Sequence, residues 1–355
     1  MFMSRKSVIL VLVALLVGAA GSAFAGGVRF VPLGVPDTLA TDVSADGRTV
    51  VGNIFYGENF SWTRSGGYVS LGGGCPVSST RISGDGLTIV SCAVDQNGNW
   101  NAARWLGGQA WQTLGTVPGG VNCDFNVSSA WGINGDGSTT VGLVWLAQLC
   151  RANAGRWDAS GQVTDMGTRF PGTASRANGI SADGHVIVGW QDLETGQRVG
   201  AKWVDGVQEL IYDGAMNNVG EAQNANDDGT VIVGSGYRNG FGWRWKQGVG
   251  FTAIGPTIID RSGVPLGASY VTDVNADGSV VVGNTSGSGR AFFWSEAGGF
   301  QYVDQFLKKA GVKVPGGWTL SGLNAVSADG RVMVGTGLHN GAFEGFVLEF
   351  DTAPR

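Results

Sequence analysis

The stretch Ser327-Ala328-Asp329-Gly330-Arg331-Val332-Met333-Val334-Gly335 is the last of seven copies of one pattern. Each copy centres on an Asp-Gly pair, with Ser or Asn two positions before the Asp and Val five positions after it. The Asp of the pair stands at positions 46, 85, 136, 183, 228, 277 and 329. Gly follows the Val in every copy but one, where Ser91 stands. A pattern that recurs every 39 to 52 residues is typical of repeat architectures.

Each copy predicts four short strands. An Asp-Gly pair between apolar runs predicts a hairpin, because Gly accepts a positive φ without strain. The apolar run after the turn, such as Val280-Val281-Val282, predicts a strand that is buried on both faces. Segments such as Ala201-Lys202-Trp203 predict a third strand, whose Trp is expected to pack between blades, and Tyr68-Val69-Ser70-Leu71-Gly72 exemplifies a fourth. Four strands per copy at this spacing indicate the blades of a β-propeller.

The two ends of the chain predict a closed ring. The seventh copy stops at Phe346-Val347-Leu348-Glu349-Phe350, which resembles a third strand without a fourth. Val28-Arg29-Phe30-Val31-Pro32-Leu33-Gly34 resembles that missing strand, so it is expected to pair into the last blade and remove an exposed edge. We therefore predict a single all-β domain over residues 26–355, a seven-bladed β-propeller, with an open β-solenoid as the alternative. The expected blades cover residues 35–72, 73–115, 116–167, 168–212, 213–255, 256–303, and 304–350 together with 26–34.

Residues 1–25 are predicted to be a signal peptide. Arg5 and Lys6 precede an apolar run of 13 residues from Val8 to Ala20, and Ala23-Phe24-Ala25 supplies the small residues that signal peptidase recognises. A membrane span needs about 20 apolar residues, so cleavage after Ala25 is expected, with an uncleaved anchor as the alternative. The mature chain is expected to be secreted, in the periplasm or outside the cell, without membrane attachment.

Composition narrows the range of partners. Removal of Arg5 and Lys6 with the leader takes the formal charge from −5 to −7, and such an acidic chain lacks the basic footprint of a nucleic-acid-binding protein. Glycine accounts for 62 of 355 residues, whereas its usual share is about 7%. This excess agrees with many turns between short strands.

The four cysteines predict two disulfides. An even number of cysteines in an exported chain favours disulfides over a metal site. The Asp85-Gly86 hairpin brings Cys75 near Cys92, whereas Cys123 and Cys150 are equally far in sequence from the next Asp-Gly turn. The expected pairs are Cys75–Cys92 and Cys123–Cys150.

The repeated Ser/Asn-x-Asp-Gly-x-x-x-Val-Gly pattern, followed by a small residue and an aromatic before Trp, resembles the bacterial HAF-repeat extracellular proteins. The stretch from Gly317-Trp318-Thr319-Leu320 to Gly335 resembles the last repeat of that family, and the resemblance covers roughly residues 26–350. The chain lacks the His of the His-Ala-Phe sequence that names the family; Arg290-Ala291-Phe292-Phe293-Trp294 is its nearest copy and Asn101-Ala102-Ala103-Arg104-Trp105 a more distant one. The resemblance implies a secreted or cell-surface β-repeat protein and brings no assigned reaction.

The sequence predicts neither a catalytic constellation nor a metal or cofactor site. Asp273-Val274-Asn275-Ala276-Asp277-Gly278 resembles the start of a calcium loop, but Asn284 stands at the twelfth position, where such a loop needs an acidic residue. The repeated Asp is instead expected to cap its own turn. His185 is expected in a solvent-facing turn and His339 in the last loop between strands. Three carboxylates in separate loops leave a carbohydrate-active enzyme open: Glu58, Glu194 and Glu221.

The variable loops are expected to carry the function. Differences in repeat length must lie in the loops between second and third strands and in those joining blades, which emerge opposite the Asp-Gly turns. Variable loops on a rigid scaffold commonly bind ligands, and aromatic side chains stack on sugars or peptides. The expected binding aromatics are Phe55, Tyr56, Phe125, Trp145, Phe170, Trp190, Tyr212, Tyr237 and Tyr270. We predict a non-enzymatic binding module with a glycan or protein ligand; the alternatives are a carbohydrate-active enzyme and a structural surface protein.

Overall fold

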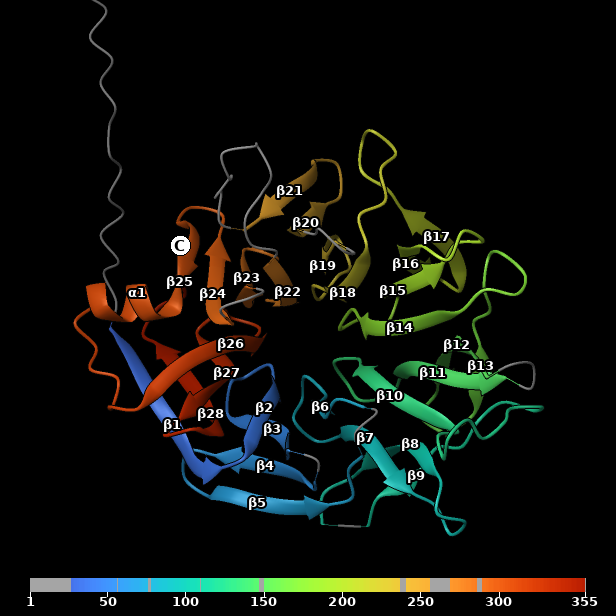
Figure 1. Cartoon of the computed structure of the whole chain (residues 1–355), viewed down its shortest axis with the longest axis horizontal. Helices are drawn as coiled ribbons and strands as arrows, with labels where there is room; N and C mark the ends of the chain where they lie inside the picture. Colours follow the sequence, from blue (N-terminus) through green and yellow to red (C-terminus); the bar gives the residue numbers. More distant parts are fainter. Residues whose placement is uncertain are drawn as a thin grey trace, which may run out of the picture.

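The computed structural model describes residues 27–55, 57–75, 78–108, 110–146, 150–236, 241–255, 269–285 and 289–354. Seven four-stranded antiparallel sheets stand around a central axis, as a seven-bladed propeller (Figure 1). This confirms the predicted fold class. The predicted signal peptide, residues 1–25, lies outside the described residues. Among the described residues, no helix is both long and apolar enough to cross a membrane.

Each sheet runs from an inner strand at the axis to an outer strand at the rim (Figure 1). The inner strands are β2 (Thr38–Val43), β6 (Arg81–Ile82), β10 (Ser128–Ile133), β14 (Ser175–Ile180), β18 (Glu221–Ala225), β22 (Ser269–Val274) and β26 (Trp318–Val326). The second strands are β3 (Thr49–Ile54), β7 (Ile89–Val94), β11 (Thr140–Leu146), β15 (Val186–Asp192), β19 (Val231–Ser235), β23 (Val280–Thr285) and β27 (Val332–His339). The third strands are β4 (Asn59–Thr63), β8 (Trp100–Trp105), β12 (Arg151–Trp157), β16 (Arg198–Val204), β20 (Gly242–Lys246), β24 (Arg290–Ser295) and β28 (Ala342–Phe350). The outer strands are β5 (Gly67–Gly72), β9 (Gln112–Thr113), β13 (Val163–Asp165), β17 (Val207–Ile211), β21 (Gly250–Ile254), β25 (Gly299–Tyr302) and β1 (Val28–Pro36).

The repeated Ser/Asn and Asp hold the turn between inner and second strands. In the first blade, Ser44 Oγ donates to Asp46 Oδ1 at 2.7 Å and accepts the Thr49 N–H at 3.0 Å. Asp46 Oδ1 also accepts the N–H of Arg48 at 3.0 Å. The bonds to the backbone recur in all seven blades, with Asn Oδ1 replacing Ser Oγ in three of them. A short side chain with an acceptor oxygen is therefore required at each position, as in other Asx turns.

The repeated Val-Gly pair is explained by packing within the sheet and not by the turn. The seven Val side chains are fully buried in the sheets. The Gly that follows six of these Val residues lies opposite a β-bulge of the inner strand, and a Cβ at Gly52 would overlap the Leu39 carbonyl oxygen. The same overlap exists at each of the other glycines of this position. Ser91 is tolerated in the second blade because the pairing of β6 with β7 ends at Arg81, before a bulge is reached.

Backbone hydrogen bonds join the blades into a ring at the start of the Asp-Gly turns. Each blade donates one N–H to a carbonyl of the next blade, and the seventh donates to the first, at distances from 3.0 to 3.4 Å. The donors are Ala45, Asp85, Gly135, Asp183, Asp227, Ala276 and Ala328. Blades two and three approach so closely that a Cβ at Gly84 would lie 3.2 Å from the Cα of Gly135.

The N-terminal strand β1 is the outer strand of the last blade and pairs antiparallel with β28, with Val31 opposite Val347. Val28, Val31 and Leu33 are buried. That β1 keeps the ring closed stays a prediction, which a deletion can test.

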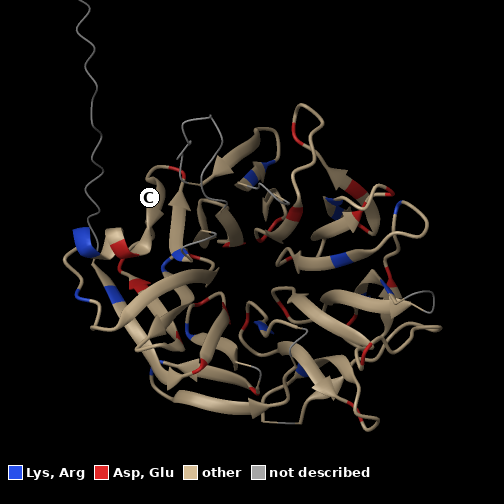
Figure 2. Ribbon diagram, viewed as in Figure 1, with Lys and Arg blue, Asp and Glu red and all other residues tan. Residues whose placement is uncertain are grey.

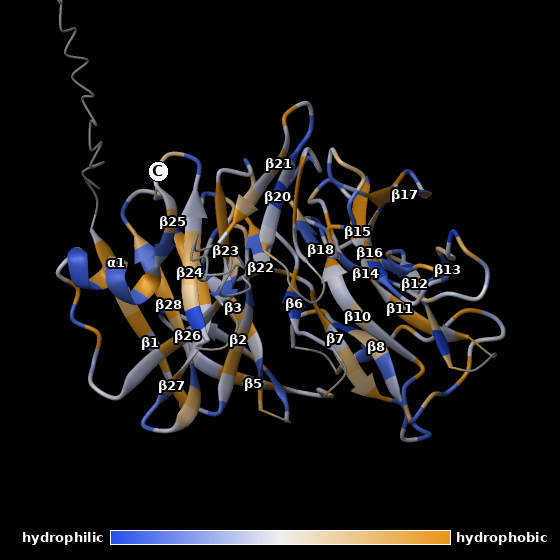
Figure 3. Cartoon of the chain, turned by 45° about the horizontal axis from the view of Figure 1, so that its top comes forward, coloured by the Kyte–Doolittle hydropathy of each residue, from blue (hydrophilic) through white to orange (hydrophobic). Residues whose placement is uncertain are grey.

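Hydrophobic residues concentrate in the strands, and many connecting loops are hydrophilic (Figure 3). Trp157 and Trp203 of the third strands are fully buried. A cation before the third-strand Trp can reach the Trp of the next blade: Lys202 Nζ lies 5.3 Å from the ring centroid of Trp245. These Trp residues therefore pack neighbouring blades together.

Two features lie outside the repeat. Disulfides Cys75–Cys92 and Cys123–Cys150 form as predicted. The helix α1 (Val303–Lys309), between β25 and β26, was not predicted. It buries Val303, Phe306 and Leu307. Their i, i+3, i+4 spacing is the signal of an amphipathic helix.

Candidate functional site

The connections between strands divide the ring into two faces. The turn face carries the seven Asp-Gly turns. The loop face carries the connections from second to third strands and those between blades, because successive strands are antiparallel. Of the predicted binding aromatics, four described ones lie in loop-face connections: Phe55, Phe125, Phe170 and Tyr212. Phe125 is the most exposed of them at 67%, and Phe55 is exposed at 43% although its ring contacts Phe343.

Three of the predicted loop aromatics lie in strands instead. Trp145 belongs to β11, Trp190 to β15 and Tyr270 to β22. Trp145 and Trp190 lie in strands because the second strands continue several residues past the repeated Val, whereas Tyr270 is at the start of an inner strand. Trp190 is only 6% exposed, whereas Tyr270 is 45% exposed. Tyr56 and Tyr237 lie outside the described residues.

The inner strands enclose a polar cavity of about 120 Å³ on the axis. Bulges in the inner strands leave Trp131, Asn178 and Gln223 without a strand partner, and these residues line the cavity. Next to them, four residues before the repeated Asp, the cavity is lined by Asp42 and Asp273. At the turn face it ends at the hydrogen-bonded ring, whose lining positions carry Ala, Gly and one Asp, Asp227.

Asp42 and Asp273 cap backbone groups of the following blade. Asp42 Oδ2 accepts the Ile82 N–H at 3.0 Å, and Asp273 Oδ2 accepts the Val326 N–H at 2.9 Å. Asp273 Oδ1 accepts from Asn224 Nδ2 at 2.6 Å. Burial, reinforced by the negative charge of Asp42, raises the pKa of Asp273 to about 7. Burial also raises the pKa of Asp42.

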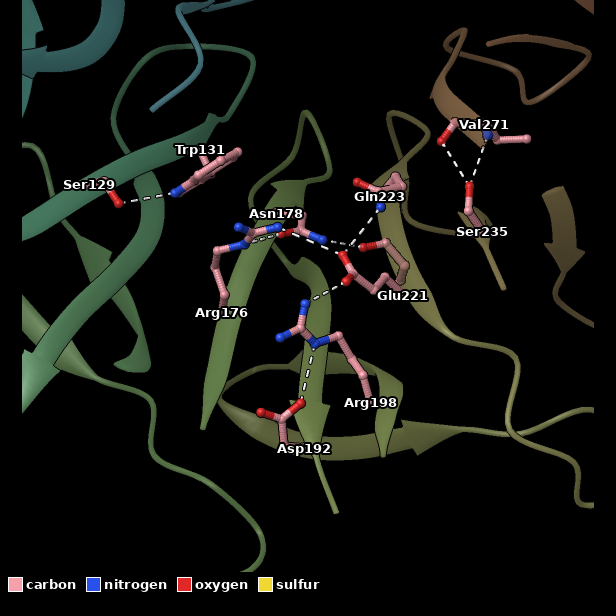
Figure 4. A network of polar contacts seen from close by, with 11 residues as sticks. Ser129, Trp131, Arg176, Asn178, Asp192, Arg198, Glu221, Gln223, Ser235 and Val271 are labelled. Atoms are coloured by element: carbon pink, nitrogen blue, oxygen red, sulfur yellow. Dashed lines mark hydrogen bonds and ion pairs between the residues drawn. The ribbon is translucent and has the colours of Figure 1, made fainter. Parts of the chain in front are cut away.

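A network of ion pairs and Trp rings lies toward the loop face in blades three to five. Figure 4 shows its ion pairs and the ring of Trp131. We call it the Arg176–Glu221 cluster. Its members are Trp131, Arg176, Trp190, Asp192, Arg198 and Glu221. Glu221 receives Arg198 Nη1 at 2.8 Å and lies 3.7 Å from Arg176 Nη2. Arg198 also pairs with Asp192 at 3.2 Å.

The Trp rings position both guanidinium groups of the cluster. Arg176 Cζ lies 4.0 Å from the ring centroid of Trp131, and Arg198 Cζ lies 3.5 Å from that of Trp190. Burial lowers the pKa of Arg176 to about 10, against the opposing effect of Glu221, so the group stays charged at neutral pH. All four charged side chains keep 18 to 29% of their surface exposed. The cluster is therefore a fixed array of donors and acceptors that solvent can reach, which suits hydrogen bonding to a polar ligand.

The sequence analysis expected Trp190 and Glu221 in separate loops, and it did not single out the other members of the cluster. A signal existed: Arg176 and Glu221 occupy the same repeat position, seven before the Asp, in adjacent blades. Opposite charges at one position of neighbouring repeats indicate an ion pair across the blade boundary. Aligning the copies over the inner strands would have found it.

The remaining candidates are scattered. His185 is exposed beside a turn, as predicted, and its Nδ1 lies 3.3 Å from Asp205. His339 ends β27 and stacks on Trp318 with a centroid distance of 4.8 Å. Glu58 accepts a hydrogen bond from Ser70 and does not belong to the cluster. In the part of the chain that the structure describes, no three His, Cys, Asp or Glu residues form a metal-binding group.

The comparisons with known proteins bear on the fold. No family model matches the chain, and no curated protein matches it in sequence. The structure is similar to oligogalacturonate lyase from Vibrio parahaemolyticus, with a TM-score of 0.56 and 13% identity, covering 91% of this chain and 97% of that one. An oligogalacturonate lyase in complex with manganese gives a TM-score of 0.56 and 14% identity, covering 93% and 94%. TolB from Acinetobacter baumannii matches with a TM-score of 0.45 and 14% identity; the alignment covers 78% of this chain and 63% of that TolB. At such identities the likeness shows the propeller fold alone.

Proposed function

We propose that the chain is a non-enzymatic binding propeller that holds a glycan on its loop face, at the Arg176–Glu221 cluster. The observation that carries the proposal is the cluster itself. Two guanidinium groups are fixed against Trp rings and paired with two carboxylates, and all four charged side chains are partly exposed. Planar guanidinium groups and carboxylates offer the directional donors and acceptors that sugar hydroxyls need.

The rest of the loop face supports this location. Phe125 and Tyr270 are exposed there and can add stacking area. The turn face offers the same turn seven times, which suits a scaffold better than a specific site. A protein ligand is the alternative occupant of this face.

The two disulfides bear on the cellular location of the protein. Two disulfides agree with an oxidising compartment, so we place the mature chain in the periplasm or outside the cell. We keep cleavage after Ala25 and membership of the HAF-repeat proteins as proposals that agree with this location.

A glycan array probed with the mature chain tests the proposal. A bound glycan should then lose at least tenfold in affinity with Arg198→Gln, because a charge-assisted hydrogen bond contributes about 1.5–3 kcal/mol. Arg48→Gln is the matched control, since Arg48 is an exposed arginine that pairs with Asp46 on the turn face. It should change the affinity less than twofold. An array without any binding, or equal losses in the two variants, would overturn the proposal.

A carbohydrate-active enzyme is the second candidate, and one observation favours it. Asp273 borders the axial cavity with a pKa of about 7, a value that suits a proton acceptor. Because the structural neighbours include oligogalacturonate lyases, oligogalacturonate is the substrate to test first. The absorbance of unsaturated products would rise with the native chain and not with Asp273→Asn if this candidate is right. A binding propeller gives no product with either chain.

A further inference from the structure

A second cavity, of about 420 Å³, lies beside α1, where the chain passes from blade six to blade seven. Figure 1 shows α1 far from the strands β14 and β18 that carry the Arg176–Glu221 cluster. The wall is mainly apolar, and 420 Å³ is within the range of small-molecule sites. The apolar lining residues are Leu307, Val312, Val314, Trp318 and Leu320.

The rim of this cavity is positively charged. Three of the six lysines of the chain, Lys308, Lys309 and Lys313, fall within six residues here. Figure 2 shows blue, cationic positions on α1 and just beyond it. Lys308 and Lys313 line the cavity. Among the described residues neither has an ion-pair partner. The one acidic lining residue, Asp304, is paired with Arg290 at 2.7 Å, so the two lysines are not neutralised.

Trp318 supplies a further unused donor. Its indole Nε1 is buried and has no hydrogen-bond acceptor among the described residues. One edge of the ring faces β27, where a Cβ at Gly337 would lie 3.1 Å from Cε3, and Nε1 is on the opposite edge. His339 and Phe30 hold the ring, by stacking at 4.8 Å and by an edge contact at 5.1 Å. A buried indole N–H without a partner costs free energy that a ligand oxygen could recover.

We propose that this cavity binds a single-chain amphiphile with an anionic head. The apolar wall takes the alkyl chain, because burial of apolar surface is favourable. Lys308 and Lys313 pair with a carboxylate or phosphate head, and the Trp318 N–H donates to an oxygen of the ligand. A fatty acid supplies a carboxylate head and a phosphorylated lipid supplies a phosphate head, and either negative charge can pair with the two lysines.

The experiment is calorimetric titration of the mature chain with decanoate, decyl phosphate, 1-decanol and acetate, below micelle-forming concentrations. Decanoate or decyl phosphate should bind saturably, and the tighter of the two identifies the head. Decanol should bind at least fivefold more weakly, and acetate should not bind detectably. If neither anionic amphiphile binds saturably at concentrations up to about 5 mM, the proposal is overturned, because a weaker site would not be occupied to a useful extent.

Variants distinguish the contribution of the lysine charges to binding from a loss of folded structure. The double variant Lys308→Gln/Lys313→Gln should weaken the binding of the preferred amphiphile at least fivefold. Lys309→Gln is the matched control, because Lys309 is exposed on the same helix and does not line the cavity. Trp318→Phe keeps an aromatic ring and removes the donor, so it should cost two- to threefold. Equal affinity of the double variant and the Lys309 control, at unchanged melting temperatures, would contradict the site.

Discussion

On the turn face every blade ends in the same Asp-Gly turn, and the ring of backbone hydrogen bonds lies directly behind it. On the loop face the connections differ in length and composition, and both disulfides lie there. Cys75 and Cys123 stand in links between blades, where the repeat prescribes no structure. Repetition stabilises one face, and covalent bonds stabilise the other. A face held in this way can vary its loops without losing the ring.

Deletion of residues 26–34 should have the largest effect, because it removes most of β1 from the one blade whose strands come from both chain ends. Burial of Val28, Val31 and Leu33 contributes about 1.5–3 kcal/mol for each side chain. We expect at least about 5 kcal/mol less stability and a melting temperature about 10 °C lower. Thermal unfolding followed by circular dichroism measures this. A shift of only a degree or two would mean that β1 does not keep the ring closed.

Loss of either disulfide should come next. Their sequence separations of 17 and 27 residues correspond to about 3 kcal/mol each in the chain-entropy model. Urea denaturation of Cys75→Ser/Cys92→Ser and of Cys123→Ser/Cys150→Ser gives the two values. If both variants unfold at the midpoint of the native chain, the loop face does not depend on covalent bonds and the contrast fails.

A matched pair of glycines compares the two faces directly. Gly229 of a turn has φ +69°, and a Cβ there would overlap Val186, whereas Gly196 of the loop face has φ +75° with open space around it. Gly196→Ala should cost about 1 kcal/mol from the backbone alone. Gly229→Ala should cost about 3 kcal/mol, because the overlap adds strain. Equal losses in chemical denaturation would show that the turn face is no more tightly packed than the loop face.

The smallest effect concerns pH and the axial cavity. The pKa of Asp273 is raised to about 7, so between pH 4 and pH 7 the folded state binds more protons than the unfolded state. The stability from this group is therefore full at about pH 4 and declines as the pH rises to 7. Asp273→Asn should therefore remove the part of the pH-dependent decline that Asp273 causes and leave the part that the raised pKa of Asp42 causes.

Urea midpoints at pH 4.5 and pH 8 give this difference. Hydrogen bonds from Ser138 and Thr230 lower the pKa of Asp136 and Asp228, so the stability that these turn carboxylates give the fold is lost only at lower pH. An identical pH slope in Asp273→Asn and the native chain would exclude Asp273 as its source.

The turns, the disulfides and the number of blades could be predicted because each is set within one repeat. Ser44, Asp46 and Val51 act on groups a few residues away, and the same causes recur in every copy. The pairing of Cys75 with Cys92 follows from one hairpin.

The candidate sites depend on contacts between blades, which no single repeat contains. Arg176 meets Glu221 and Trp131 from two other blades, and only the ring geometry brings them together. Helix α1 has a clear periodicity but lies where the repeat predicts a link between strands. The local helical periodicity there competes with a regular long-range repeat that predicts only strands and links.

The hydrogen-bonded ring at the turn face also governs how the molecule opens. The residues just after each inner strand donate to one neighbouring blade and accept from the other, so no single blade can swing away without breaking two of these bonds. Brief local unfolding should therefore start at the outer strands and leave the axis intact. In a deuterium-exchange experiment the amides of Ala45, Gly135 and Ala328 would then belong to one slow, concerted class, although they are distant in sequence.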